Sequence, residues 1–389
     1  MPRFPLLADS ASSLSDRVFG GTGQRTGAVP GRVYPLNVGD TYIDPLPAAQ
    51  AQAQTTADHP RMHNYSPVQG EPVLLDAILG KVERRSGVHL ERELVQVMNG
   101  ATSGLGVVCT ALLAPGEEVL LPSPFWPLIR GIIKYRGATP VEVPLWTRLG
   151  EEDFDPVAAL ESAITERTVA IYINSPHNPT GGILPDQVAD GIAELAARHD
   201  LWVITDEVYE DLWYHDAPPR SLWTRADLRE RAIVTHSVSK AYGLAAARVG
   251  YTHGPAGAME VIRGVQTFFT YCAPRPMQLG AARALSEGDA WLAEARAAYR
   301  KAAATTASAL DLPMPQGGSF IFFPAAPYLR EGEQTADLLQ RCMDAGVMLT
   351  PGTSSGEAFG DWLRICFTSV PQRELEEALH VLRGVLFPA

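Results

Sequence analysis

The stretch Ile233-Val-Thr-His-Ser-Val-Ser-Lys240 joins a short apolar run to a Ser-x-Ser-Lys sequence. The run Ile233 to His236 predicts a buried β-strand. A lone lysine is usually a solvated surface group. Lys240 instead follows a predicted strand directly, which makes it a candidate for chemistry that needs a primary amine.

Similar apolar runs on both sides of this stretch predict an α/β domain. They are Val119 to Leu121, Val141 to Val143, Val169 to Ile173, Trp202 to Thr205 and Val249 to Thr252. Helical patterns such as 187–198 alternate with them, and a helix is expected from Pro72 to about Gly87. This alternation predicts a three-layer domain with a mostly parallel central sheet covered on both faces.

Beyond about Gly288 the pattern changes to long helices and two late strands, 319–323 and 363–367. We therefore expect a smaller α+β domain, formed by the C-terminal part and the N-terminal segment. The predicted division is an N-terminal arm and part of the small domain over 1–45, a large domain over 46–288 and a small domain over 289–389. A chain of 389 residues is long enough for two cores.

Composition limits the possible partners. The formal net charge of -12 argues against nucleic acid, because a polyanion requires a basic surface. No run approaches the roughly 20 apolar residues of a membrane helix. The N-terminal segment lacks the apolar core of a secretory leader, and the four cysteines show no zinc-ligand spacing. These features predict a cytoplasmic enzyme with reduced cysteines that acts on small molecules.

Four short segments carry the candidate chemistry. They are Ser175-Pro-His-Asn-Pro-Thr-Gly-Gly182, Thr205-Asp-Glu-Val-Tyr209, Ser237-Val-Ser-Lys240 and Arg248. In this order and spacing they resemble class I/II aminotransferases, pyridoxal-phosphate enzymes of fold type I similar to aspartate aminotransferase. The resemblance extends from about Leu36 to Leu382. It implies a transferase of amino-acid metabolism that uses pyridoxal 5'-phosphate.

The resemblance gives Lys240 the central role. A cofactor aldehyde needs a primary amine that forms an imine and later moves a proton at the substrate carbon, so Lys240 is expected to be the Schiff-base lysine. Asp206 ends an apolar strand, where a buried carboxylate needs a cation, and the resemblance implies that this cation is the protonated pyridine nitrogen. Tyr209 and Asn178 resemble donors to the cofactor's phenolic oxygen, although Asn178 is also a good turn residue.

The cofactor phosphate needs donors and positive charge. Ser237, Arg248 and the backbone of Ala101 and Thr102, which precede a helix expected over 103–113, can supply them.

Two aromatic residues resemble further cofactor contacts. Trp126 stands where the family places a ring stacked on the cofactor, although Phe125 next to it leaves the register open. Tyr65 resembles a tyrosine that reaches the phosphate of the neighbouring subunit, which implies a homodimer with shared active sites. The alternative for Tyr65 is a buried tyrosine within one chain.

Arg364 lies in a late apolar strand, where a guanidinium needs a planar anion. By resemblance it binds the substrate α-carboxylate, with Gly39 and Asn178 also lining the substrate site; an ion pair within the domain is the alternative. Arg275, between two prolines, departs from the family pattern. It either contacts a side-chain carboxylate, contacts the phosphate bound by the partner chain, or is a loop residue without a role in the site. The sequence shows no obvious second arginine that would bind the side-chain carboxylate of a dicarboxylic substrate.

The expected reaction moves an amino group from an L-amino acid to a 2-keto acid by a ping-pong mechanism, with Lys240 as the proton carrier. The alternative is a pyridoxal-phosphate lyase or cyclase, acting by β-elimination or by cyclisation of arginine derivatives. Such an enzyme needs no keto acid. The sequence leaves the choice open, because the bond that breaks depends on geometry.

Overall fold

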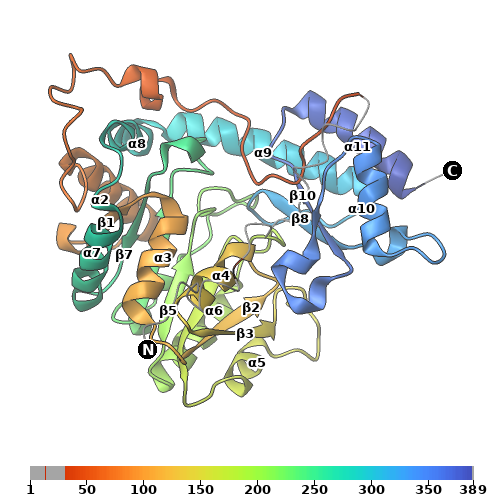
Figure 1. Ribbon diagram of the computed structural model, residues 1–389, viewed down its shortest axis with the longest axis horizontal. Helices are drawn as coiled ribbons and strands as arrows, with labels where there is room; N and C mark the ends of the chain where they lie inside the picture. The colour runs from red at the N-terminus through yellow and green to blue at the C-terminus, as the bar shows by residue number, and fades with distance from the viewer. Residues whose placement is uncertain (1–13, 15–30, 388–389) are drawn as a thin grey trace, which may run out of the picture.

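A seven-stranded sheet forms the centre of the protein, in the order β1-β7-β6-β5-β4-β2-β3 (Figure 1). The computed structural model describes residues 14 and 31–387. Strands β2 to β6 are parallel to one another, whereas β7 is antiparallel to both β1 and β6. The strands are β1 Val95–Met98, β2 Glu118–Ser123, β3 Thr139–Pro144, β4 Thr168–Asn174, β5 Trp202–Asp206, β6 Ala232–Ser237 and β7 Gly250–His253. The predicted mostly parallel sheet is confirmed.

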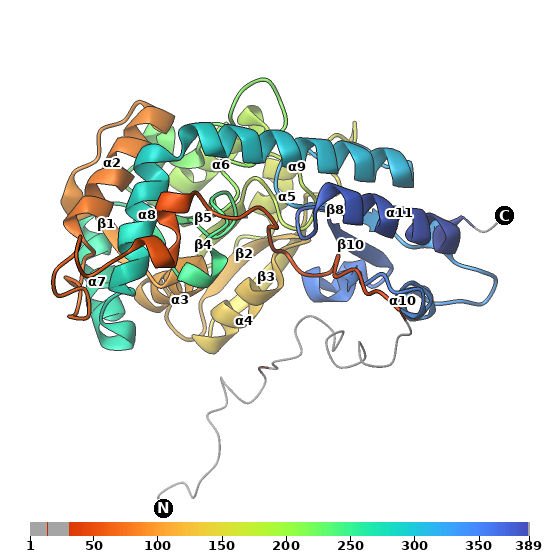
Figure 2. The same cartoon turned by 90° about the horizontal axis from the view of Figure 1, so that it is seen from above.

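Alternation along the central strands produces two separate apolar cores. Ile171 of β4 and Val203 of β5 face one core, and Tyr172 and Ile204 face the other. The second core lies under α3 Gly100–Leu112, α4 Pro127–Tyr135 and α7 Ala256–Thr270. The first is covered by α2 Pro72–Ser86, α5 Pro156–Ser162, α6 Asp186–Arg198 and α8 Arg275–Glu287. Figure 2 shows α3 and α4 on the opposite side of the sheet from α6.

A smaller antiparallel sheet stands beside the first, in the order β8-β10-β9. Its strands are β8 Phe320–Pro324, β9 Thr350–Pro351 and β10 Trp362–Cys366, and its helices are α9 Asp289–Leu310, α10 Thr335–Asp344 and α11 Gln372–Leu386. The N-terminal segment joins this unit, because Tyr34 bridges Val347 and the Cys366 amide donates to the Leu36 carbonyl at 2.7 Å. The boundary predicted near residue 288 falls between α8 and α9 and stays a prediction.

Helix α2 ends as its sequence predicts. Gly87 follows the last helical residue with φ +68°, and its amide donates to the Glu83 carbonyl at 2.8 Å. Glycine adopts this left-handed conformation without a Cβ clash, so it ends the helix at little cost. Within the described residues, no helix is both long and apolar enough to cross a bilayer.

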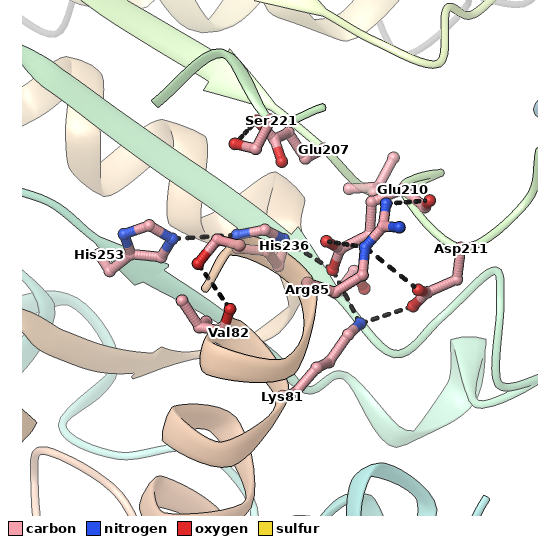
Figure 3. Close-up of polar contacts among 12 residues, drawn as sticks. Lys81, Val82, Arg85, Glu207, Glu210, Asp211, Ser221, His236 and His253 are labelled. Atoms are coloured by element: carbon pink, nitrogen blue, oxygen red, sulfur yellow. Dashed lines mark hydrogen bonds and ion pairs between the residues drawn. The ribbon is translucent and has the colours of Figure 1, made fainter. Parts of the chain in front are cut away.

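A buried ionic network attaches α2 to the sheet (Figure 3). Lys81 Nζ lies 2.8 Å from Glu210 Oε1 and 2.6 Å from Asp211 Oδ2, and His236 Nδ1 lies 2.9 Å from the same Glu210 oxygen. Glu207, Glu210 and His236 also lie close enough to share a cation. The facing atoms of Glu210 and His236 already bond to each other, however, and Lys81 supplies positive charge. We therefore regard the network as a structural link between helix and sheet.

Candidate active site

One cavity of about 210 Å³ lies at the carboxyl ends of the parallel strands, between the two sheets. Ligands of open α/β sheets bind at this edge. Every predicted site residue except Tyr65 lines the cavity: Gly39, Ala101, Thr102, Trp126, Asn178, Asp206, Tyr209, Ser237, Lys240, Arg248 and Arg364. The structure therefore brings together residues that are up to 325 positions apart in the chain (39 to 364).

Lys240 is largely buried, and its amine donates to the Gly39 carbonyl. Burial lowers the pKa of Lys240, and the nearby charges of Arg364 and Arg248 lower it further, whereas Asp40 raises it. A lowered pKa increases the fraction of neutral amine near pH 7. Neutral amine is the form that attacks a carbonyl carbon, so this lysine is suited to nucleophilic chemistry.

Asp206 ends β5 and is only 3% exposed. Its Oδ2 accepts from the Tyr172 hydroxyl at 2.8 Å, and its Oδ1 accepts from the Val208 amide at 3.3 Å. Burial raises the pKa of Asp206 to about 6, and these two hydrogen bonds oppose the rise. No cation forms an ion pair with Asp206 in the part of the chain that the structure describes, so its carboxylate can accept a cationic ligand.

The start of α3 forms an anion cradle with Arg248. The helix begins at Gly100, earlier than predicted, so Ala101 and Thr102 lie in its first turn, where amides lack helical partners. No side chain caps this end. A Cβ at Gly100 would overlap the Arg248 guanidinium, which shows how closely that cation approaches the helix start. The hydroxyl of Ser237 completes this end of the cavity.

Arg364 is a buried guanidinium without an acidic partner among residues 31–387. Nη1 donates to Asn178 Oδ1 at 3.0 Å, and Nη2 donates to the Asn37 carbonyl at 3.1 Å and to Thr350 Oγ1 at 3.2 Å. Its Nε has no hydrogen-bond partner. The alternative of an ion pair within the domain therefore finds no support, and a carboxylate ligand fits this cation better.

Tyr209 and Asn178 face each other beside Arg364. Burial raises the pKa of Tyr209, while the charge of Arg364 and a hydrogen bond with Asn178 oppose that rise. Asn178 also belongs to a tight loop, since its amide donates to Asn174 Oδ1 at 2.8 Å. Asn178 is therefore both a turn residue and a residue of the cavity, the two roles that its sequence context suggested.

Trp126 lines the cavity at the start of α4, whereas Phe125 is fully buried in the core. The sequence left open which of the two aromatic residues lines the cavity. The structure places Trp126 at the cavity and Phe125 in the core.

Tyr65 lies outside this cavity. It is 81% exposed and packs edge-to-face on Tyr271, with ring centroids 5.1 Å apart. It is therefore not a buried tyrosine within one chain. Arg275 lies nearby, 2.9 Å from Glu71 and bonded to the Arg61 carbonyl at 2.8 Å, so it has a carboxylate partner of its own.

Sequence reasoning missed several residues of the site. Asn174, Ser239 and Phe320 line the cavity, and Asn174 donates to the Asp206 carbonyl at 2.8 Å. Asn174 is the last residue of strand β4 and directly precedes the Ser175-to-Gly182 segment. This position beside a recognised motif could have identified it as a site residue. Tyr172 gave no such signal, because a tyrosine within an apolar strand is usually core.

Comparisons with known proteins agree with this site. The family model for aminotransferase class I and II matches residues 32–382. The chain is 31% identical over 365 residues to an aspartate aminotransferase of Pyrococcus abyssi, covering 91% of this chain and 92% of the relative. It is 34% identical over 334 residues to an arginine–pyruvate transaminase of Pseudomonas aeruginosa, covering 84% and 82%.

Solved structures give the same result. The aspartate aminotransferase of Rhizobium meliloti superposes with a TM-score of 0.89 at 26% identity, covering 98% of this chain and 99% of that one. The aromatic aminotransferase of Pyrococcus horikoshii superposes with a TM-score of 0.84 at 28% identity, covering 94% and 98%. The match over almost the whole length makes the chain an enzyme of the transferase type, and it belongs to the class I and II aminotransferases.

Proposed function

We propose that this protein is a pyridoxal-phosphate-dependent aminotransferase that moves an amino group from an L-amino acid to a 2-keto acid by a ping-pong mechanism. The convergence of four groups in one cavity carries the proposal: the amine of Lys240, the carboxylate of Asp206, which has no ion-pair partner among the described residues, and the guanidinium groups of Arg248 and Arg364. The aminotransferase relatives support transamination over elimination or cyclisation.

The residues of the cavity fit the cofactor by their chemistry. Arg248, Ser237 and the amides of Ala101 and Thr102 would hold the phosphate, and Trp126 would cover the ring. Asp206 would meet the ring nitrogen, while Tyr209 and Asn178 would serve the phenolic oxygen. Bound pyridoxal phosphate supplies an aldehyde carbon for the amine and a ring that withdraws electrons from the substrate carbon.

Lys240, Arg364 and Gly39 would serve the substrate. The lowered pKa of Lys240 lets its amine take a proton from the substrate Cα and return one afterwards. Arg364 binds the substrate α-carboxylate, and its own bonds to Asn178 and Thr350 fix its orientation. Gly39 lies opposite. Phe320 is so close to it that a side chain at this position would clash with the ring.

We also propose a homodimer in which Tyr65 completes the partner's site. Tyr65 and Tyr271 belong to a region with two more exposed aromatic side chains, Phe268 and Phe269, which are 92% and 56% exposed. Exposed apolar patches of this kind favour association. All four cysteines are unpaired, which supports a reducing compartment such as the cytoplasm.

Cofactor capture by the lysine tests the proposal. We would incubate the cofactor-free protein and its Lys240→Ala variant with pyridoxal phosphate, reduce both with borohydride and map the modified peptide by mass spectrometry. We expect one modified residue, Lys240, and no modification at the other lysines of the variant. An unmodified wild-type protein, or modification spread over surface lysines, would contradict the proposal.

Ping-pong transfer is tested separately. An amino acid added alone should convert the bound cofactor once and stop, and a keto acid should restart the reaction. Continued turnover without any keto acid would instead support a lyase or cyclase.

A further inference from the structure

Tyr172 reaches Asp206 across two neighbouring strands. Asn174 of β4 pairs with Asp206 of β5, so Tyr172 lies two residues away on the same face of the sheet. This diagonal separation is within reach of an aromatic side chain. Its hydroxyl donates to Asp206 Oδ2 at 2.8 Å, and the two residues are only 2% and 3% exposed.

The hydroxyl of Tyr172 is fully committed to this contact. The ring packs in the core beneath α3, and the Asp206 carboxylate is the only hydrogen-bond partner of its hydroxyl among the described residues. Each carboxylate oxygen has two acceptor positions. Tyr172 and the Val208 amide use one on each oxygen, which leaves acceptor capacity toward the cavity that Asp206 lines.

We propose that Tyr172 is a positioning residue: its hydroxyl keeps the Asp206 carboxylate ionised and oriented so that it accepts a cationic ring nitrogen in the cavity. The inference rests on the proposed function only for the identity of that nitrogen. The hydrogen bond itself acts on Asp206 whether or not the cofactor is bound.

Few other groups can hold this carboxylate ionised. Tyr172 faces Asp206 from β4, Tyr209 follows on the same chain segment, and His236 of β6 acts on the carboxylate only through charge. His236 lies in the network on the opposite face of the sheet, bonded to Glu210. Among the described residues, Tyr172 is the only side chain that donates a hydrogen bond to the Asp206 carboxylate; the other donor is the Val208 amide. Losing this donor should therefore shift the carboxylate toward its protonated form.

The direct test uses cofactor-free protein. The titration of the Asp206 carboxyl would be followed by carbon-13 NMR in wild type, Tyr172→Phe and Tyr251→Phe. Tyr251 is a matched control, because its buried hydroxyl has no hydrogen-bond partner in the described chain. We expect the midpoint to rise by about one pH unit in Tyr172→Phe, as for the loss of one hydrogen bond to a charged group, and to stay unchanged in Tyr251→Phe.

Cofactor affinity against pH gives the second readout. In Tyr172→Phe, binding of pyridoxal phosphate should be roughly fivefold weaker than wild type near pH 6 and approach wild type above about pH 8. A purely structural role would weaken binding by the same factor at every pH. In an Asp206→Asn background, Tyr172→Phe should have no effect on affinity.

The outcomes separate the two proposals. If wild type does not bind pyridoxal phosphate, the proposed function fails, while the NMR titration still decides the role of Tyr172. If wild type binds and transaminates but Tyr172→Phe has the titration midpoint and pH profile of wild type, the inference is overturned alone. An equal loss of affinity at all pH values, or in the Asp206→Asn background, would also overturn it.

Discussion

Asp206 and Arg364 are buried charged side chains that lack an oppositely charged partner among the described residues. Burying a charge without such a partner costs several kcal/mol, and proteins tolerate this mainly at functional sites. The two side chains lie in the same cavity, where Asp206 accepts cations and Arg364 accepts anions. A zwitterionic substrate and a cofactor with a protonated ring match both requirements.

Replacing Asp206 should stabilise the cofactor-free protein. Its folded-state pKa of about 6 lies above the ordinary value of 3.8, so the folded state holds the proton more tightly than the unfolded state. The contribution of Asp206 to stability is therefore highest below about pH 4 and falls by about 3 kcal/mol as pH rises through 6. Asp206→Asn should remove that loss and raise the free energy of unfolding at pH 7, measured in urea.

The exposed Asp153→Asn variant is the matched control for charge removal, and it should leave the pH dependence unchanged. A lower free energy of unfolding for cofactor-free Asp206→Asn at pH 7 would contradict this expectation. Loaded with cofactor, the same variant should lose affinity, because its amide does not pair with a cationic ring nitrogen.

Arg364→Lys should weaken substrate binding while the protein stays folded. A lysine keeps the charge but loses the planar pair of donors that a carboxylate requires. We expect KM for the amino acid to rise about thirtyfold, equivalent to about 2 kcal/mol. Steady-state kinetics measures this, with the exposed Arg373→Lys as control. An unchanged KM would remove Arg364 from the substrate site.

The central strands and the loops at their carboxyl ends set the geometry of the cavity. Strand β4 contributes Tyr172 and Asn174, β5 contributes Asp206 and β6 leads to Ser237 and Lys240. On the other face, the network around Lys81 attaches α2 to the segment that follows β5 (Figure 3). The same strands therefore contribute cavity residues on one face and hold helix α2 through the Lys81 network on the other.

Lys81→Met should destabilise the protein strongly. The change leaves the buried carboxylates of Glu210 and Asp211 without their nearest cation, which typically costs about 3 to 5 kcal/mol. Thermal unfolding would show a clear drop in Tm. Lys301→Met, on an exposed position of α9, should have little effect. Equal Tm values for the two variants would mean that the network does not hold α2 in place.

The sequence predicted β2 and β4 to β7, because burial on both faces leaves a clear apolar pattern, and it also predicted the less buried edge strand β3. It missed β1, a four-residue strand at the sheet edge that contains Gln96. The segment containing Lys240 and the Asp206 strand were recognisable locally. Contacts such as Arg364 with Asn178 join segments 186 residues apart, so only the resemblance suggested that they share a site.

The proposed dimer determines whether each site is complete. Tyr65 does not reach the cavity of its own chain and is exposed in a region of aromatic side chains. Within one chain, Arg248 and the start of α3 form the end of the cavity that we propose holds the phosphate. A second copy that supplies Tyr65 would close that end, so association and cofactor binding should be linked.

Mixing two inactive variants tests this arrangement. Lys240→Ala lacks the amine, and Tyr65→Ala lacks the hydroxyl that the proposed partner would receive. In a mixed dimer, one site combines an intact Lys240 with the partner's intact Tyr65. Mixing under conditions that exchange subunits should therefore restore activity that neither variant shows alone. Mixtures that remain as inactive as the separate variants would indicate that Tyr65 acts within its own chain or has no role at the site.

Transfer of nitrogen-15 from an amino acid to a 2-keto acid tests whether the protein is an aminotransferase that depends on Lys240. Wild type and Lys240→Ala, each supplied with pyridoxal phosphate, would receive a panel of nitrogen-15 amino acids together with an unlabelled 2-keto acid. We expect nitrogen-15 to appear in the amino acid formed from the keto acid, and only when Lys240 is present. Release of the label as ammonia, or equal transfer by Lys240→Ala, would contradict an aminotransferase built around Lys240.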